Sequence, residues 1–115
     1  MKELRFSGSD LGSLRTYLEK EYSGVEHIKV VKESSDIFVS EQLTRGYFTS
    51  MHNVGCFIIY SEKNPNECNI KIVAAGGGYG VLNTAGKKVR NRTEEKVHED
   101  IFKYARELRL KEEIL

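Results

Sequence analysis

The stretch Ile-Lys-Ile-Val-Ala-Ala-Gly-Gly-Gly-Tyr-Gly, residues 70–80, carries the clearest structural signal in this sequence. Residues 70–75 are mostly apolar, which is typical of a strand. Four glycines then occupy the five positions 76–80. Glycines placed in this way supply positive φ angles, or they leave room for another backbone or a ligand. We therefore predict a strand that ends in an unusual turn, and we expect any site to lie near this turn.

Several segments upstream also have the composition of strands, namely residues 25–32, 37–43 and 54–60. The last of these is nearly all apolar, as expected for a central strand with at least one covered face. Residues 47–51 form either a short strand of their own or an extension of the preceding one. A polar Lys-Asn-Pro-Asn turn at 63–66 then leads toward residues 70–75. These short connections favour an antiparallel meander.

Two segments have the periodicity of amphipathic helices. The first, residues 10–22, has its apolar positions at Leu11, Leu14, Leu18 and Tyr22. The second, residues 92–112, has them at Val97, Ile101, Ala105 and Leu108. Asn91 and Glu94 have the spacing of a capping box, so we expect the second helix to begin there, after a polar loop that extends through Lys88.

The order of these elements predicts an α+β fold. We expect a two-layer sandwich with an N-terminal helix, an antiparallel meander sheet of four to five strands, and a C-terminal helix. The length of 115 residues fits one domain that covers positions 1–115.

Composition narrows the class of protein. Hydrophobic residues make up 39% and charged residues 30%, which indicates a globular chain and not a disordered one. The formal net charge of +1 provides no overall attraction to nucleic acids or anionic membranes. No apolar stretch approaches the roughly 20 residues of a membrane span, and residues 1–6 lack the apolar core of a signal peptide. We therefore expect a cytoplasmic protein.

The two cysteines, Cys56 and Cys68, are expected to be free thiols. If the turn centres on Asn64 and Pro65, Cys56 pairs near Val73 and is too far out of register to bridge to Cys68. We expect Cys56 to be a small buried apolar side chain and Cys68 to be more exposed. A nucleophilic role would need a nearby base that the sequence does not identify.

The glycine turn can be interpreted as a cradle for an anion such as a phosphate, because successive backbone N–H groups can converge on one ligand. Basic side chains follow at 87, 88 and 90. The segment lacks the third glycine of a dinucleotide fingerprint, and its glycine spacing does not match a P-loop. A purely structural turn is therefore the favoured interpretation. The residues of this candidate anion site are Gly76, Gly77, Gly78, Tyr79, Gly80, Lys87, Lys88 and Arg90.

Other chemistry has less support in the sequence. The basic run at 87–92 is followed by Glu94, Glu95, Glu99 and Asp100, which would repel a nucleic-acid backbone. The three histidines lie in different predicted elements, and none has a second ligand at a metal-binding spacing. We therefore predict no metal and no cofactor, assign no catalytic residue, and do not expect nucleic-acid or membrane binding.

The apolar residues of the predicted C-terminal helix indicate a surface for self-association. It carries apolar side chains off its main stripe, at Phe102, Leu110, Ile114 and Leu115. A second apolar patch of this kind favours a homodimer.

The segment Ala-Gly-Gly-Gly-Tyr-Gly-Val-Leu, residues 75–82, resembles a turn shared by a family of small uncharacterised prokaryotic α+β proteins. In that family an Ala-Gly-Gly-Gly-x-Gly turn lies between the last strand and the final helix. The resemblance covers this turn and the order of elements in the last half of the chain. It supports the predicted fold order and implies no activity.

Three functional hypotheses remain open, in this order. The first is a non-enzymatic binding or protein-interaction module. The second is a binder of small molecules or anions that uses the glycine turn. The third is a small hydrolase or transferase with a site assembled across the sheet from Cys, His and Tyr side chains.

Overall fold

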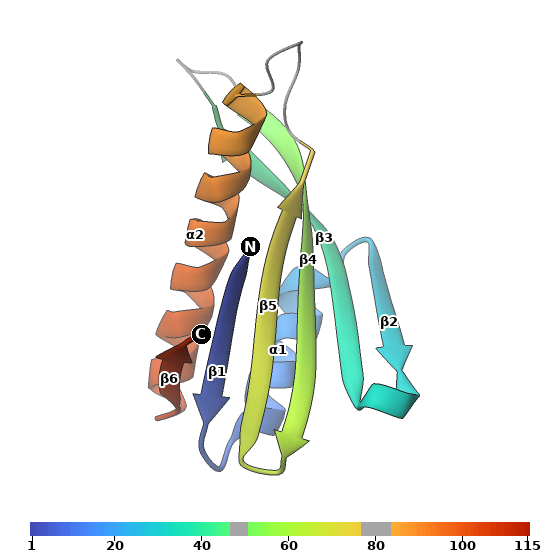
Figure 1. The fold of residues 1–115 in the computed structure, drawn as a ribbon, viewed down its shortest axis with the longest axis vertical. Helices are drawn as coiled ribbons and strands as arrows, with labels where there is room; N and C mark the ends of the chain where they lie inside the picture. The colour runs from blue at the N-terminus through green and yellow to red at the C-terminus, as the bar shows by residue number, and fades with distance from the viewer. Residues whose placement is uncertain (47–50, 77–83) are drawn as a thin grey trace.

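The computed structural model describes residues 1–46, 51–76 and 84–115. In chain order its elements are β1 (Lys2–Ser7), α1 (Leu11–Tyr22), β2 (Glu26–Val30), the 3₁₀ turn η1 (Val31–Glu33), β3 (Ser35–Arg45), β4 (Met51–Asn64), β5 (Glu67–Ala75), α2 (Thr84–Glu107) and β6 (Lys111–Ile114). The described strands form one sheet in the order β2-β3-β4-β5-β1-β6, and every pairing is antiparallel (Figure 1). The predicted α+β fold with a helix toward each end is confirmed.

The prediction of four to five strands was too low, because β1 and β6 were missed. β1 pairs with β5 on one side and with β6 on the other. In β1 only Leu4 and Phe6 are buried, and charged residues stand between and before them. β6 has the sequence Lys-Glu-Glu-Ile, which favours a helix when it is considered alone.

Helix α2 begins at Thr84 instead of residue 92, and it ends at Glu107 instead of residue 112. The predicted capping box at Asn91 and Glu94 is therefore wrong, as is the polar loop through Lys88. The early start has a packing reason. Val89 and Thr93 are buried and precede Val97 at intervals of four residues, so the apolar stripe continues back toward the start of the helix.

A Schellman motif ends α2. The N–H of Leu110 donates to the carbonyl of Ala105 at 2.9 Å, and the N–H of Arg109 donates to the carbonyl of Arg106 at 3.0 Å. Arg109 has a φ of 58°, the left-handed conformation that this motif requires. Because arginine stands where glycine is usual, this helix end has no clear signal in the sequence.

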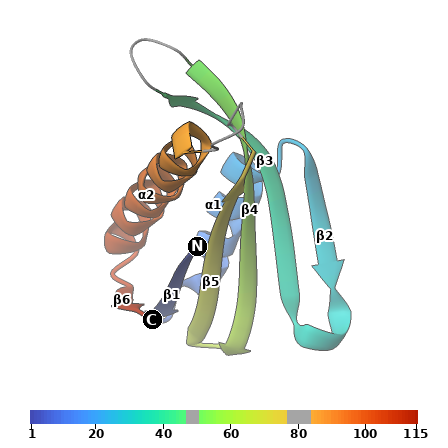
Figure 2. The same cartoon turned by 45° about the horizontal axis from the view of Figure 1, so that its top comes forward.

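The core lies between the two helices and one face of the sheet (Figure 2). On this face alternate residues of the central strands are buried, among them Phe38, Ile58 and Ile70. The two helices contact each other through Tyr17 and Tyr104, whose rings stack at 4.1 Å between centroids. The opposite face of the sheet is covered by neither helix.

The strands predicted at 37–43 and 54–60 are the middle parts of the longer β3 and β4. The predicted segment 47–51 lies mostly outside the described residues, and only Met51 is assigned, as the first residue of β4. The turn between β4 and β5 includes Pro65, as predicted.

Candidate functional site

The glycine turn begins where the sequence places it, directly after β5. Gly76 has a φ of 81°, so a positive φ is present at the first of the four glycines. An added Cβ at Gly76 would meet nothing within 4 Å, so at this position the glycine serves the backbone conformation and not a close contact. The predicted site residues Gly77, Gly78, Tyr79 and Gly80 lie outside the described residues.

The basic residues of the predicted anion site lie on the first turns of α2 and not in a loop. Lys87 and Lys88 are exposed. The Arg90 guanidinium donates to the carbonyl oxygen of Gly76 at 3.3 Å, which brings it to the start of the glycine turn. Arg92 donates to the carbonyls at the end of β3, at 2.9 Å to Arg45 and 3.1 Å to Gly46.

The charges at this end of α2 are the reverse of the usual distribution. The first turn holds no acidic residue, whereas three basic side chains follow by position 90. The N-terminus of a helix carries partial positive charge, so basic residues there are unfavourable in the absence of an anion. This arrangement concentrates positive potential beside Gly76.

From the sequence we expected Glu94 to repel a nucleic-acid backbone, but its side chain does not face outward. Its side chain is buried and accepts the backbone N–H of Ala74 at 2.9 Å. It also forms an ion pair of 2.8 Å with the amino group of Met1. These contacts join α2 to β5 and compensate the buried carboxylate.

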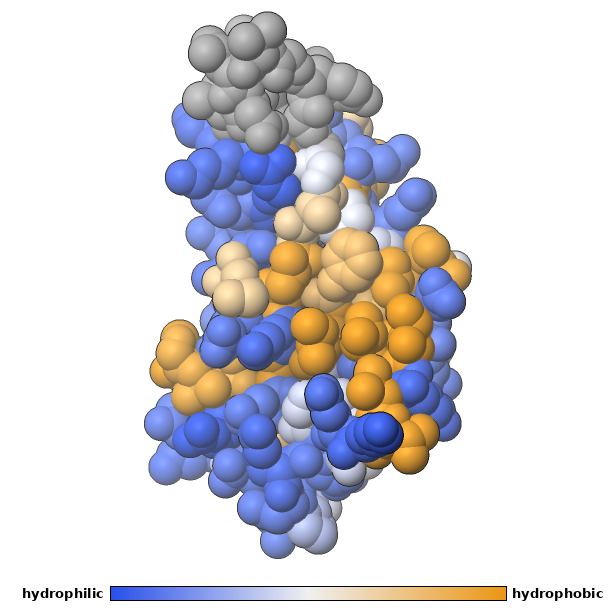
Figure 3. Space-filling view, turned by 45° about the vertical axis from the view of Figure 1, so that its right-hand side comes forward, coloured by the Kyte–Doolittle hydropathy of each residue, from blue (hydrophilic) through white to orange (hydrophobic). Residues whose placement is uncertain are grey.

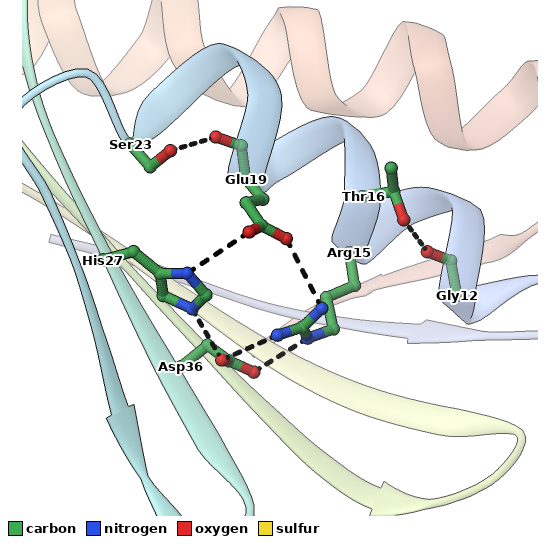
Figure 4. Close-up of polar contacts among 7 residues, drawn as sticks. All are labelled: Gly12, Arg15, Thr16, Glu19, Ser23, His27 and Asp36. Carbon is green, nitrogen blue, oxygen red and sulfur yellow. Dashed lines mark hydrogen bonds and ion pairs between the residues drawn. The ribbon is translucent and has the colours of Figure 1, made fainter.

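A polar cluster joins α1 to β2 and β3 on the helix-covered side of the sheet (Figure 4). Arg15 donates two hydrogen bonds of 2.9 Å to the carboxylate of Asp36. His27 Nε2 lies 2.8 Å from Asp36 Oδ1, and His27 Nδ1 lies 3.4 Å from a carboxylate oxygen of Glu19. The hydrogen bonds from Arg15 hold the pKa of Asp36 below its ordinary value, and that of Arg15 is raised in turn.

This cluster has the residue types of an acid–base site but the geometry of a structural one. Both ring nitrogens of His27 face carboxylates, those of Asp36 and Glu19, so each has a partner inside the cluster. The adjoining open pocket has a mixed lining that includes Lys29, Ser34 and Glu62. Sequence reasoning missed the cluster because its members come from three elements, and no short spacing connects them.

The cysteines do not form a nucleophilic site. Both are free and buried, so the expectation that Cys68 is more exposed was wrong, whereas the burial of Cys56 is confirmed. The pairing of Cys56 with Ala74 places it one residue from the predicted partner, Val73. Burial raises the pKa of each thiol to about 11, which keeps both protonated near neutral pH.

Within residues 1–46, 51–76 and 84–115, no three His, Cys, Asp or Glu side chains come together as ligands for a metal ion.

The uncovered face of the sheet carries an apolar surface that the sequence analysis did not identify. Two rows of apolar residues run across it, Ile28-Ile37-Ile59 and Val39-Phe57-Val73, and each row follows the strand register. Phe57 is 37% exposed and Ile28 is 40% exposed, while the other four are partly exposed. Figure 3 looks onto this face, where apolar side chains gather in its middle. The open-face patch is defined as Ile28, Ile37, Val39, Phe57, Ile59 and Val73.

The surface predicted for self-association is not one helical face. Leu110 follows α2 and is buried, while Ile114 ends β6, Leu115 follows it, and both are exposed. Of the four predicted residues only Phe102 lies on α2, where Arg106 covers its ring at 5.8 Å. The sequence pattern failed here because the helix ends at Glu107, so the residues beyond it no longer follow helical spacing.

Comparison with protein-family models, with curated proteins and with solved structures finds no match to this chain. Within the described residues, neither helix has the length and apolar character needed to cross a membrane.

Proposed function

We propose that this chain is a non-enzymatic protein-interaction module that binds a partner protein on the open-face patch. The observation that carries the proposal is the apolar character of outward-facing positions in the middle of the sheet. An antiparallel sheet with one solvated face normally alternates apolar and polar residues. In β3, Ile37 and Val39 face outward, where that alternation would place polar residues, while the polar Asp36 and Ser40 are buried.

Contiguous exposed apolar surface of this kind marks sites of interaction. The patch is built on four hydrogen-bonded strands and not on loops. Gly55 lies on the same face beside Phe57, whose ring is 3.7 Å from the place of a Cβ on Gly55. The aromatic ring therefore extends along the sheet toward Gly55. An exposed aromatic ring of this kind is typical of protein interaction surfaces.

The test places a photoreactive residue on the patch, as Phe57→p-benzoylphenylalanine, in living cells that produce the chain. The matched control puts the same residue at the exposed position Lys20 on α1. We expect a defined covalent adduct with one protein from position 57, identified by mass spectrometry and lost when Ile59→Lys is added. Adducts that form equally from position 20, or none from position 57, would overturn the proposal.

A second candidate function is the binding of a small anion at the glycine turn. It is favoured by the basic first turns of α2 and by the contact of Arg90 with Gly76. The Lys87 side chain is exposed and can be removed without disturbing the core. A bound anion would offset the unfavourable charge at this helix end.

Thermal unfolding in inorganic phosphate, at ionic strength held constant with chloride, tests this second function. Binding predicts a melting temperature that rises with phosphate concentration, and the rise is lost in Lys87→Ala. Lys103→Ala, at an exposed position later in the same helix, is the control and keeps the rise. An unchanged melting temperature in phosphate, or equal responses of the two variants, would contradict it.

We further infer that the chain acts in a reducing compartment, the cytoplasm. Two free, buried thiols support this inference.

A further inference from the structure

We infer that β6 is a releasable strand whose attachment to the rest of the molecule depends on the protonation of His98. Protonated His98 favours the attached strand, and neutral His98 favours the detached one. The pair that controls the attachment, His98 and Glu112, lies on the helix-covered side of the sheet. It is therefore separate from the open-face patch.

β6 has little apolar contact to hold it in place. It is four residues long, forms one edge of the sheet and packs against β1 and α2 (Figure 1). Its apolar residue Ile114 is 72% exposed, and Leu115, which follows the strand, is 48% exposed. Of the four residues of β6 only Glu112 is not exposed. The side chain that ties this strand to α2 is therefore a carboxylate and not an apolar group.

The carboxylate of Glu112 depends on His98. Its Oε1 lies 2.8 Å from Nε2 of His98 on α2, and the two side chains are 9% and 18% exposed. Its Oε2 is buried and has no hydrogen-bond partner in the described part of the chain. A buried carboxylate is unfavourable unless a cation compensates its charge. Protonated His98 supplies that cation, whereas the neutral ring supplies only a weaker neutral donor.

The other charged groups of α2 on this side do not take the place of His98. Glu94 lies one turn before it, and its carboxylate is held by the backbone N–H of Ala74 and the amino group of Met1. Glu95, also one turn before, is exposed. Both are acidic, so neither can compensate a second carboxylate.

The strands beside the pair supply no nearby cation either. On the helix-covered side of β1 the charged residue is Lys2, four residues before Phe6, which pairs with Glu112. That separation is about 13 Å along the strand. In β6 the neighbours of Glu112 point to the opposite face, where Glu113 lies 3.4 Å from Arg5. The charge of Glu112 is thus compensated when His98 is protonated and not otherwise.

Release of β6 uncovers the edge of β1. β6 pairs with residues 4–7 of β1, and the N–H of Leu115 donates to the carbonyl of Glu3 at 2.9 Å. β1 itself stays in the sheet, because it also pairs with β5 and its Leu4 and Phe6 are fully buried. An uncovered strand edge is a template for pairing with another extended segment. The attached β6 blocks that edge.

Amide hydrogen exchange followed by NMR tests the inference on the intact chain. Protection factors, corrected for intrinsic exchange, are measured at about pH 5.5 and about pH 8, the range in which histidine changes its charge. We expect the protection of the Leu115 amide to fall roughly threefold to fivefold at the higher pH, because a charge-assisted hydrogen bond becomes a neutral one. Equal protection at the two pH values would overturn the inference.

Variants identify the group responsible. His98→Gln keeps a neutral donor, and Glu112→Gln removes the carboxylate, so each should abolish the pH effect at Leu115. His27→Gln is the matched control and should retain the effect, since His27 also lies 2.8 Å from a carboxylate oxygen and is 18% exposed. Circular dichroism verifies that each variant is folded. A fall in protection that persists in folded His98→Gln or Glu112→Gln, or that disappears in folded His27→Gln, would overturn the inference.

Discussion

The carboxylate of Asp36 shows how one side chain can connect three elements. It accepts two hydrogen bonds from Arg15 on α1 and contacts His27 on β2, while it belongs to β3. Its residue is only 8% exposed, so a loss of these partners would leave a buried polar group unsatisfied. We therefore assign the cluster a role in stability.

Asp36→Asn should lower the free energy of unfolding by about 2 kcal/mol at neutral pH, because it removes the charge that Arg15 requires. The hydrogen bonds from Arg15 lower the folded-state pKa of Asp36 below its ordinary 3.8. The stabilisation is thus fully present above that value and is lost as pH falls through the lower folded-state pKa. Urea unfolding of both chains across acidic pH checks this. A difference that stays constant down to the most acidic pH would contradict it.

Gly8 and Gly12 allow a comparison between a glycine that the fold requires and one that it does not. Gly8 has a φ of 154°, and a Cβ there would lie 2.5 Å from Cδ2 of Leu110. Gly8→Ala should therefore cost about 1–3 kcal/mol. At Gly12, in α1, an added Cβ meets nothing within 4 Å, so Gly12→Ala should stabilise by about 0.5–1 kcal/mol. Thermal or chemical unfolding measures both, and equal effects of the same sign would refute this interpretation.

Among the elements, the middle of α2 was predicted correctly, but both of its boundaries were wrong. Its apolar stripe at Val97, Ile101 and Ala105 follows helical spacing and all three are buried. The start was missed because the basic run before Asn91 suggested a loop, although Val89 continues the stripe. The end was missed because Arg109 occupies a position where glycine is the usual signal.

Arg109→Gly should stabilise the chain by about 0.5–1 kcal/mol, since it relieves the strain of a side chain in the left-handed conformation. Lys103→Gly, at an exposed position inside α2, should instead destabilise by about 1 kcal/mol. Equilibrium unfolding in urea distinguishes the two. Destabilisation by Arg109→Gly as large as that by Lys103→Gly would show that the Schellman motif does not control the end of this helix.

The strands show the same dependence on context. Residues 54–60 and 70–75 could be predicted because their apolar content is high. β1 and β6 could not be predicted, because they are stabilised by pairing with residues far away in the sequence. Leu4 of β1, for example, pairs with Ile70 of β5 and with Ile114 of β6. Local propensity does not report such long-range pairing.

At the scale of the whole molecule, the sheet order explains why the candidate sites differ from the predicted ones. The order β2-β3-β4-β5-β1-β6 with both helices on one face leaves the other face uncovered. Apolar alternation in each strand was visible in the sequence, but which face the helices would cover was not. The open-face patch therefore emerged only from the assembled sheet, whereas the glycine turn was visible as a motif.

We propose that the uncovered sheet face is the binding surface of this protein. The most direct measurement compares photocrosslinking from position 57, in the middle of the open-face patch, with photocrosslinking from position 20 on α1, in living cells that produce the chain. We expect a defined covalent adduct with one protein from position 57, lost when Ile59→Lys is added. Adducts that form equally from position 20, or none from position 57, would contradict the proposal.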